Sequence, residues 1–190
     1  VSLVFSGMLV FRPAPEVAAV RFSIEPPENT AFISSMAASF ILSPNGRQLA
    51  MLVSSPSGGA RISVRSLDAL EARPLAGTEG AAASTPFWSP DSRFIGFVAQ
   101  GKLKKIEFSG GPAQTLCDAP GWSGGTWNRE GDIIFSTAGS LMRVSSAGGK
   151  PAPLTTLDKS RGERSHAWPY FLPDGDHFLY LSQTGQQENN

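Results

Sequence analysis

The segment 170–181 (YFLPDGDHFLYL) consists of two short apolar stretches separated by Pro173, Asp174 and Gly175. Proline restricts φ to about −65°, aspartate bonds back to the local backbone and glycine accepts positive φ, so the three residues together favour a tight turn. The flanking stretches are rich in Phe, Tyr and Leu and are typical of β-strands. The segment is therefore predicted to form a strand, a turn and a second strand.

The same pattern occurs three more times. The copies are FILSPNGRQLAML at 40–52, FWSPDSRFIGFV at 87–98 and TWNREGDIIFS at 126–136. The equivalent turn positions, Pro44, Pro90, Arg129 and Pro173, follow one another at intervals of roughly 39 to 46 residues, which is close to the length of a β-propeller blade. Helical repeats of this length would need apolar residues at helical spacing, which these copies lack.

Two of the four turns depart from the pattern. Ser92 occupies the position of the glycine in the second turn, so either that turn has a different geometry or Ser92 bears strain. In the third turn Arg129 and Glu130 replace Pro-Asp, while Gly131 is kept.

An almost unbroken apolar run follows each turn, which predicts a strand covered on both faces, as in the middle of a stacked blade. These runs are 49–53, 94–98, 133–135 and 178–181. A second pair of strands follows in the first three copies, at 61–67 with 72–75, 102–108 with 113–117, and 141–145 with 152–156. The joint at 68–71 is expected to be a hairpin turn, with a single helical turn as the alternative.

The predicted fold class is all-β. We expect a β-propeller of about three and a half four-stranded blades, forming an incomplete ring over residues 24–190. The predicted blades are 31–78, 79–118, 119–158 and a partial blade at 159–190. Because an open arc exposes strand edges and blade faces, we expect the native protein to continue past Asn190.

These residues resemble the TolB-like propeller repeat, the Pro-Asp-Gly relative of the WD repeat, over roughly residues 24–181. A closer resemblance is to the C-terminal propellers of bacterial membrane-spanning serine/threonine protein kinases. It is carried by SLDALEARPLAGTEGAAASTPFWSPDSRFIGF at 66–97, GKLKKIEFSGGPAQTLCDAPG at 101–121 and GERSHAWPYFLPDGDHFLYL at 162–181. The resemblance implies an extracytoplasmic (periplasmic) propeller anchored in the bacterial inner membrane, although this chain contains no kinase domain.

The N-terminal residues 1–11 (VSLVFSGMLVF) are apolar and uncharged, but too few to span a membrane. They are interpreted as the end of a transmembrane helix, with a strand or a frayed hydrophobic end as the alternative. Residues 12–23 then form a linker.

Composition argues against several classes of function. Sixteen basic residues balance sixteen acidic ones, so no basic footprint for nucleic acid is present and any membrane contact is assigned to the N-terminal anchor. We find no phosphate-binding loop, kinase loop, nucleophile elbow or metal-ligand spacing, and we predict no catalytic residue, metal or cofactor. Asp174 and Asp176 are interpreted as turn residues.

Candidate binding residues lie in two polar-aromatic segments, 120–127 (PGWSGGTW) and 161–170 (RGERSHAWPY), which lead into the innermost strands of two blades. They are Trp122, Trp127, Arg164, His166 and Trp168. The alternative is that the tryptophans pack between blades while Arg and His bond to loop carbonyls. Lys102, Lys104 and Lys105 are expected to mark a solvated edge strand, and only weakly a binding patch.

The predicted function is therefore a non-catalytic binding or sensor module, with an unknown protein or small molecule bound at a propeller face. Two alternatives stay open. One is a propeller fragment of a prolyl-oligopeptidase-like hydrolase, and the other is a TolB-like periplasmic scaffold.

Overall fold

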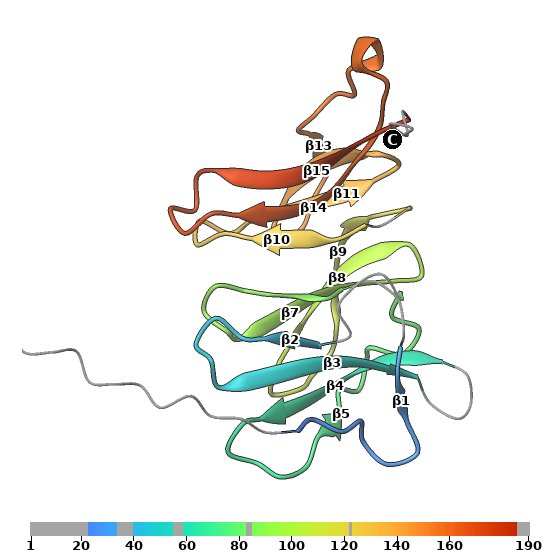
Figure 1. Cartoon of the computed structure of the whole chain (residues 1–190). Helices are drawn as coiled ribbons and strands as arrows, with labels where there is room; N and C mark the ends of the chain where they lie inside the picture. Colours follow the sequence, from blue (N-terminus) through green and yellow to red (C-terminus); the bar gives the residue numbers. More distant parts are fainter. Residues whose placement is uncertain (1–22, 34–39, 55–58, 83–84, 122, 186–190) are drawn as a thin grey trace, which may run out of the picture.

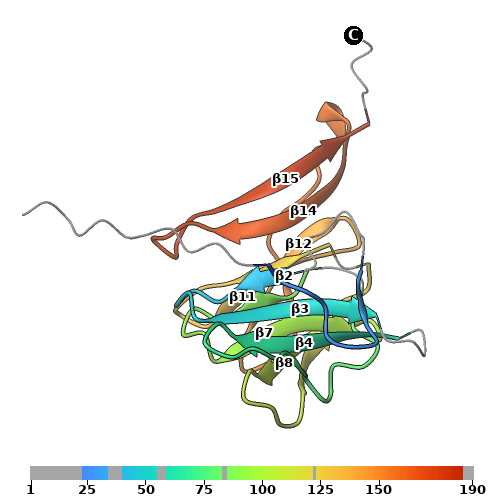
Figure 2. The ribbon, with the colours of Figure 1, turned by 60° about the horizontal axis from the view of Figure 1, so that its bottom comes forward.

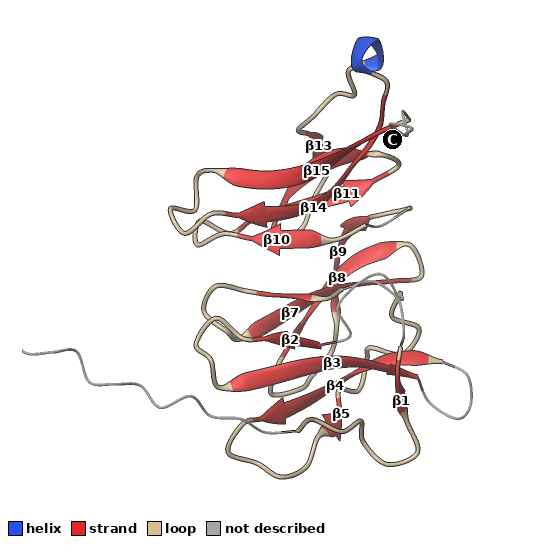
Figure 3. Ribbon diagram, in the orientation of Figure 1, coloured by secondary structure: helices blue, strands red, loops and turns tan. Residues whose placement is uncertain are grey.

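The computed structural model describes residues 23–33, 40–54, 59–82, 85–121 and 123–185. Its elements are strands, apart from one short 3₁₀ turn, η1 (Lys159–Arg161), which is the blue coil in Figure 3. The possible membrane segment 1–11 and the linker up to residue 22 lie outside the described residues. Within them, no helix is long and apolar enough to cross a membrane.

The strands form four separate antiparallel sheets in chain order (Figure 1). The first contains β1 (Ala31–Phe32), β2 (Phe40–Leu42), β3 (Gln48–Ser54), β4 (Ala60–Ser66) and β5 (Arg73–Pro74). The second contains β6 (Phe87–Trp88), β7 (Phe94–Ala99), β8 (Lys102–Glu107) and β9 (Gln114–Asp118). The third contains β10 (Gly125–Trp127), β11 (Asp132–Thr137), β12 (Ser140–Ser145) and β13 (Ala152–Pro153). The fourth is the hairpin of β14 (Glu163–Phe171) and β15 (Phe178–Thr184). The predicted all-β fold is confirmed, with the difference that the first sheet has five strands because β1 and β2 both pair with β3.

The turns that join the first two strands of each blade form as the repeat predicts. In the first blade Asn45 Oδ1 accepts hydrogen bonds from Ser43 Oγ at 2.7 Å and from the Arg47 N–H at 3.0 Å. In the fourth, Asp174 Oδ1 accepts the N–H groups of Asp176 and His177, both at 3.0 Å. These side-chain to backbone bonds explain why the turns carry Asn or Asp.

Ser92 adopts the geometry that glycine has in the other turns. Its φ is 62°, against 69° at Gly46, 89° at Gly131 and 79° at Gly175. The second turn is therefore not a different type, and Ser92 bears the strain of the left-handed region.

Side chains of the middle strands alternate between two inter-blade cores. On β7, Ile95 and Phe97 join the core shared with the first blade, whereas Val98 joins the core shared with the third. The same separation holds on β8, where Ile106 belongs to the first core and Leu103 to the second. The side chains of one continuous apolar run thus pack against both neighbouring blades, as predicted for stacked blades.

The fourth apolar run does not follow this expectation. Leu179, Tyr180 and Leu181 of β15 are exposed by 61%, 41% and 44%. β14 packs on the third blade, while β15 is the outer strand of the end hairpin (Figure 2). The outer face of the first blade is better covered, because Ile24 and Phe32 pack on its middle strand.

The expectation of an edge strand at the three lysines is wrong. β8 pairs with β7 on one side and with β9 on the other, so it lies inside the second blade. Lys102 forms an ion pair with Asp118 at 2.7 Å. The joint at 68–71 links β4 to its antiparallel neighbour β5, so the predicted hairpin is confirmed.

Candidate functional site

Two cavities meet where the inner strands of the blades enter their turns. Both are lined by Pro90, Trp127, Asn128 and Arg129, so the end of β10 separates one cavity from the other. The turns are held together at this rim, since the Asn45 N–H donates to Ser92 Oγ at 3.1 Å. Asn128 Nδ2 likewise donates to the Gly175 carbonyl at 3.1 Å. Hydrogen bonds at the rim therefore join the four turns in two pairs, the first with the second and the third with the fourth.

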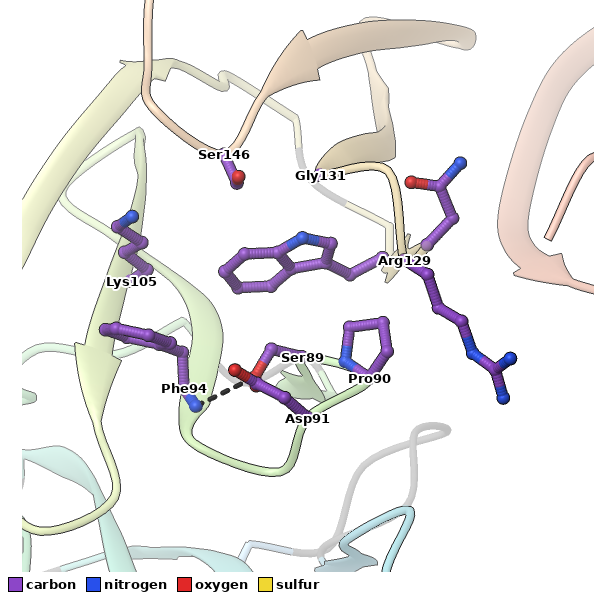
Figure 4. A pocket seen from close by; sticks show the side chains of 10 residues that line it. Ser89, Pro90, Asp91, Phe94, Lys105, Arg129, Gly131 and Ser146 are labelled. Carbon is purple, nitrogen blue, oxygen red and sulfur yellow. Dashed lines mark hydrogen bonds between the residues drawn. The ribbon is translucent and has the colours of Figure 1, made fainter.

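The first cavity, which we call the inter-blade cavity, lies between the second and third blades and has a volume of about 440 Å³. Its lining is Ser89, Pro90, Asp91, Phe94, Lys105, Trp127, Asn128, Arg129, Gly131 and Ser146. In Figure 4 Lys105 and Phe94 lie on one side, and the guanidinium of Arg129 points outward on the other. The cavity thus has aromatic walls and polar groups at its edges, as small-molecule sites commonly do.

The aromatic walls come from different blades. The rings of Phe94 and Trp127 lie 6.2 Å apart at 35°. Lys105 Nζ lies 5.1 Å from the Phe94 centroid and 6.0 Å from that of Trp127. At these distances the ammonium is attracted by both ring faces.

Asp91 is the acidic residue of this cavity. Burial raises the pKa of its carboxyl, but hydrogen bonds from Ser89 and the Arg93 N–H, together with the Arg93 charge, outweigh burial. The net effect is a pKa below the usual value, so Asp91 is ionised at neutral pH.

The second cavity, which we call the axial groove, has a volume of about 520 Å³ and follows the inner strands of all four blades. Its lining is mainly apolar, and Leu42 and Tyr170 are exposed there by 54% and 67%. Arg129 is the one charged residue among the described residues that line it. This composition suits an apolar segment that carries a negative charge.

The described residues offer no obvious centre for metal or nucleophilic chemistry. In that part of the chain no three His, Cys, Asp or Glu side chains are grouped as metal ligands. Burial, with the charge of Asp118, raises the pKa of the Cys117 thiol to about 11. Cys117 is therefore protonated at neutral pH, whereas a nucleophilic cysteine needs a thiolate.

The structure of this chain is similar to several solved structures. TolB from Acinetobacter baumannii superimposes with a TM-score of 0.64 at 14% identity, over 79% of this chain and 38% of that one. A putative TolB from Agrobacterium tumefaciens gives 0.63 at 16% identity, over 83% of this chain and 60% of that one. The chain has the β-propeller fold. It spans less than two thirds of either TolB chain.

Other propellers are also similar in structure. A prolyl endopeptidase superimposes with a TM-score of 0.54 at 15% identity, over 76% of this chain and 24% of that one. The sequence matches no family model, and no curated protein matches it. At such low identities the likeness concerns the propeller fold.

Of the five predicted binding residues, only Trp127 lines the two cavities among those that the structure describes. Trp122 lies outside the described residues. Arg164 is exposed and lies beside Gly185, at the far end of the β14–β15 hairpin from the rim. The Trp168 N–H donates to the Ser123 carbonyl at 2.9 Å, and its ring packs against Gly124 while 38% of the residue stays exposed.

His166 is buried between the third and fourth blades of the propeller. It is 1% exposed, with Nδ1 at 2.8 Å from Thr155 Oγ1 and Nε2 at 3.0 Å from Glu163 Oε2. Its carbonyl accepts a hydrogen bond from Ser136 Oγ at 2.9 Å. A hydroxyl, an imidazole and a carboxylate thus stand in line as in nucleophilic enzymes, but here the imidazole is buried and the three groups join two blades.

Glu163 is the carboxylate of this network. The Asp158 N–H, then Ser182 and His166, hydrogen-bond to it and lower its pKa below the usual value. The network ties β14, β15 and the segment before η1 together. The partners of the His166 ring are the side chains of Thr155 and Glu163, whereas the alternative interpretation expected loop carbonyls.

Sequence reasoning missed Phe94, Lys105, Arg129 and Tyr170 as lining residues. A signal for the groove was available in the repeat. The turns begin at Ser43, Ser89, Asn128 and Leu172. The two residues before each of these positions, for example Tyr170 and Phe171 in the last copy, line the axial groove.

Proposed function

We propose that this chain is a non-catalytic propeller module that binds a peptide segment of a protein partner in the axial groove. The observation that carries the proposal is the groove itself, where four blades present apolar side chains around one arginine. Within the described residues, the Arg129 guanidinium has no hydrogen bond or ion pair to a protein group. A partner segment with apolar side chains and one carboxylate would satisfy both features.

The finer assignment is the extracytoplasmic sensor region of a membrane-anchored bacterial serine/threonine kinase. Its support is the resemblance of segments 66–97, 101–121 and 162–181 to the propellers of such kinases. In this assignment the groove presents a rigid surface outside the membrane, and the kinase activity belongs to another part of the protein. Sequencing of the gene upstream of Val1 should reveal a complete transmembrane helix and a kinase catalytic loop.

A second candidate is the propeller of a prolyl-oligopeptidase-like hydrolase, which the structural similarity to a prolyl endopeptidase favours. This candidate predicts a nucleophile elbow, Gly-x-Ser-x-Gly, in the flanking gene sequence. A TolB-like periplasmic scaffold predicts instead a cleavable signal peptide and no kinase.

Selection from a random peptide library on the immobilised 190-residue chain tests the groove directly. We expect the selected peptides to combine apolar residues with an acidic one. Arg129→Glu and Tyr170→Ala should each weaken the binding by about tenfold or more, as loss of a central interface anchor does.

The chain offers matched controls for both substitutions. Tyr180 is the other tyrosine and lies on β15, and Arg161 is exposed in η1. Tyr180→Ala and Arg161→Glu should leave peptide affinity unchanged. Equal losses in the control and groove variants, or none in either, would contradict binding in the axial groove.

A further inference from the structure

Lys105 is a cation without an acidic partner in the interior of a sheet. It lies on β8, half-buried, and its Nζ has no hydrogen bond or ion pair within the described part of the chain. Glu107, two residues further along β8, is already paired with Arg93 at 3.7 Å. The ammonium of Lys105 is therefore available to a ligand.

The direction of Lys105 follows from the alternation of β8. Leu103, two residues earlier, belongs to the core between the second and third blades, so Lys105 shares that face. Lys104 lies on the opposite face with Ile106, which belongs to the core with the first blade. Adjacent lysines on one strand thus face different blades, and only Lys105 lines the inter-blade cavity.

The walls around Lys105 suit a flat apolar ring. Phe94 and Trp127 contribute two faces tilted by 35°, and the cavity volume of about 440 Å³ lies in the range of small-molecule sites. Asp91 lines the same cavity but forms no ion pair with Lys105, and its Oδ1 accepts hydrogen bonds from Ser89 Oγ at 2.5 Å and from the Arg93 N–H at 3.1 Å. With Arg129 as a second cation, the charged lining has a net positive charge.

We infer that the inter-blade cavity is a separate site for a small aromatic carboxylate, whose acid group binds Lys105 while its ring packs on Phe94 and Trp127. The inference does not depend on a peptide in the axial groove, because Lys105 and Phe94 line the inter-blade cavity alone. A charge-assisted bond to a partly desolvated ammonium supplies the preference for an anion, and the rings supply the preference for an aromatic body.

Titration with 2-naphthoate and with its neutral analogue 2-naphthamide tests the site, using calorimetry on the 190-residue chain. We expect the acid to bind about tenfold more tightly than the amide, which is ~1.4 kcal/mol of preference. Lys105→Met should abolish the preference, because it keeps the apolar stem and removes the charge. Lys105→Arg should keep most of it, which separates loss of charge from loss of folding.

Lys104→Met is the matched control, since it removes the same charge from the other face of the same strand. It should leave both affinities unchanged, while Trp127→Leu should weaken acid and amide alike. Equal binding of acid and amide by the native chain, a preference that survives Lys105→Met, or no binding of 2-naphthoate at millimolar concentration would each overturn the inference.

Discussion

Ser92 contributes two opposed effects to stability, a strained backbone conformation and a hydrogen bond to the neighbouring blade. Its φ of 62° lies where the other three turns carry glycine, and its Oγ accepts the Asn45 N–H of the neighbouring blade. A non-glycine residue in the left-handed region costs about 1 kcal/mol, and a neutral hydrogen bond contributes a similar amount. The two effects therefore nearly cancel in the native chain.

This balance predicts an order of stability for two substitutions. Ser92→Ala keeps the strain and loses the acceptor, whereas Ser92→Gly loses the acceptor but relieves the strain. Ser92→Gly should therefore be more stable than Ser92→Ala by about 1 kcal/mol. Urea denaturation measures the difference, and an alanine variant as stable as the glycine variant would show that Ser92 is not strained.

Gly96 is required because the ring of Phe87, its cross-strand partner on β6, covers it. A Cβ placed on it would lie 2.3 Å from the Phe87 ring, which is enclosed between the second and third blades. Gly96→Ala should destabilise the chain by about 1 to 3 kcal/mol, as overpacking does in a filled core. Gly59 has nothing within 4 Å, so Gly59→Ala is the control and should change the free energy of unfolding little in a thermal denaturation experiment.

Local turn chemistry could be predicted from the sequence because Pro, Asn, Asp and Gly act within a few residues of one another. The burial of His166 could not be predicted from the sequence. A polar side chain near an aromatic segment is equally consistent with a binding surface and with a buried network. Its burial depends on Thr155 and Glu163, which only the folded blades bring within hydrogen-bonding distance.

At the scale of elements, β15 differs from the other second strands of the blades. It pairs only with β14 among the described strands, and it exposes Leu179, Tyr180 and Leu181. Exposed apolar strands with an unpaired edge promote association of chains.

We therefore expect the 190-residue chain to associate with increasing concentration, and Leu179→Lys with Leu181→Lys to reduce this association. Charged residues on an edge strand oppose pairing. Sedimentation velocity over a concentration series measures the effect. Leu70→Lys is the control, because Leu70 is 93% exposed in a turn away from β15. If Leu70→Lys reduced association equally, the cause would be general surface hydrophobicity and not the exposed strand β15.

The apolar run of β15 was predicted to be covered on both faces, as in β3, β7 and β11. Like the others, this run is an unbroken stretch of apolar and aromatic residues, so its composition does not indicate that it is exposed. Burial depends on whether a neighbouring sheet packs on each face. For the same reason, the direction of Lys105 required the pairing of β8 with both of its neighbours.

At the scale of the whole molecule, four carboxyl groups have pKa values below their usual values. They are Asp91, Asp158, Glu163 and Asp174. A group with a depressed folded-state pKa stabilises the fold above its unfolded pKa, and this contribution is lost as the pH falls through the folded value. The unfolded values are 3.8 for aspartate and 4.5 for glutamate.

Stability should therefore be retained from neutral pH down to about pH 5 and fall at lower pH. Glu163→Gln should show a shallower fall, because a neutral amide does not titrate. Urea midpoints measured between neutral pH and about pH 3 test this, with Glu28→Gln as an exposed control for which no hydrogen bond or ion pair is found among the described residues. If the urea midpoint of Glu163→Gln fell as steeply with pH as that of the native chain, Glu163 would not contribute to the loss of stability in acid.

The propeller arrangement brings together four segments that are far apart in the sequence, and this convergence is the central claim. Hydrogen–deuterium exchange of the chain with and without a selected acidic peptide measures it directly. We expect simultaneous protection of 41–44, 86–90, 125–129 and 170–175, which together line the axial groove. Protection confined to one of these segments, or located instead on β15, would contradict the account.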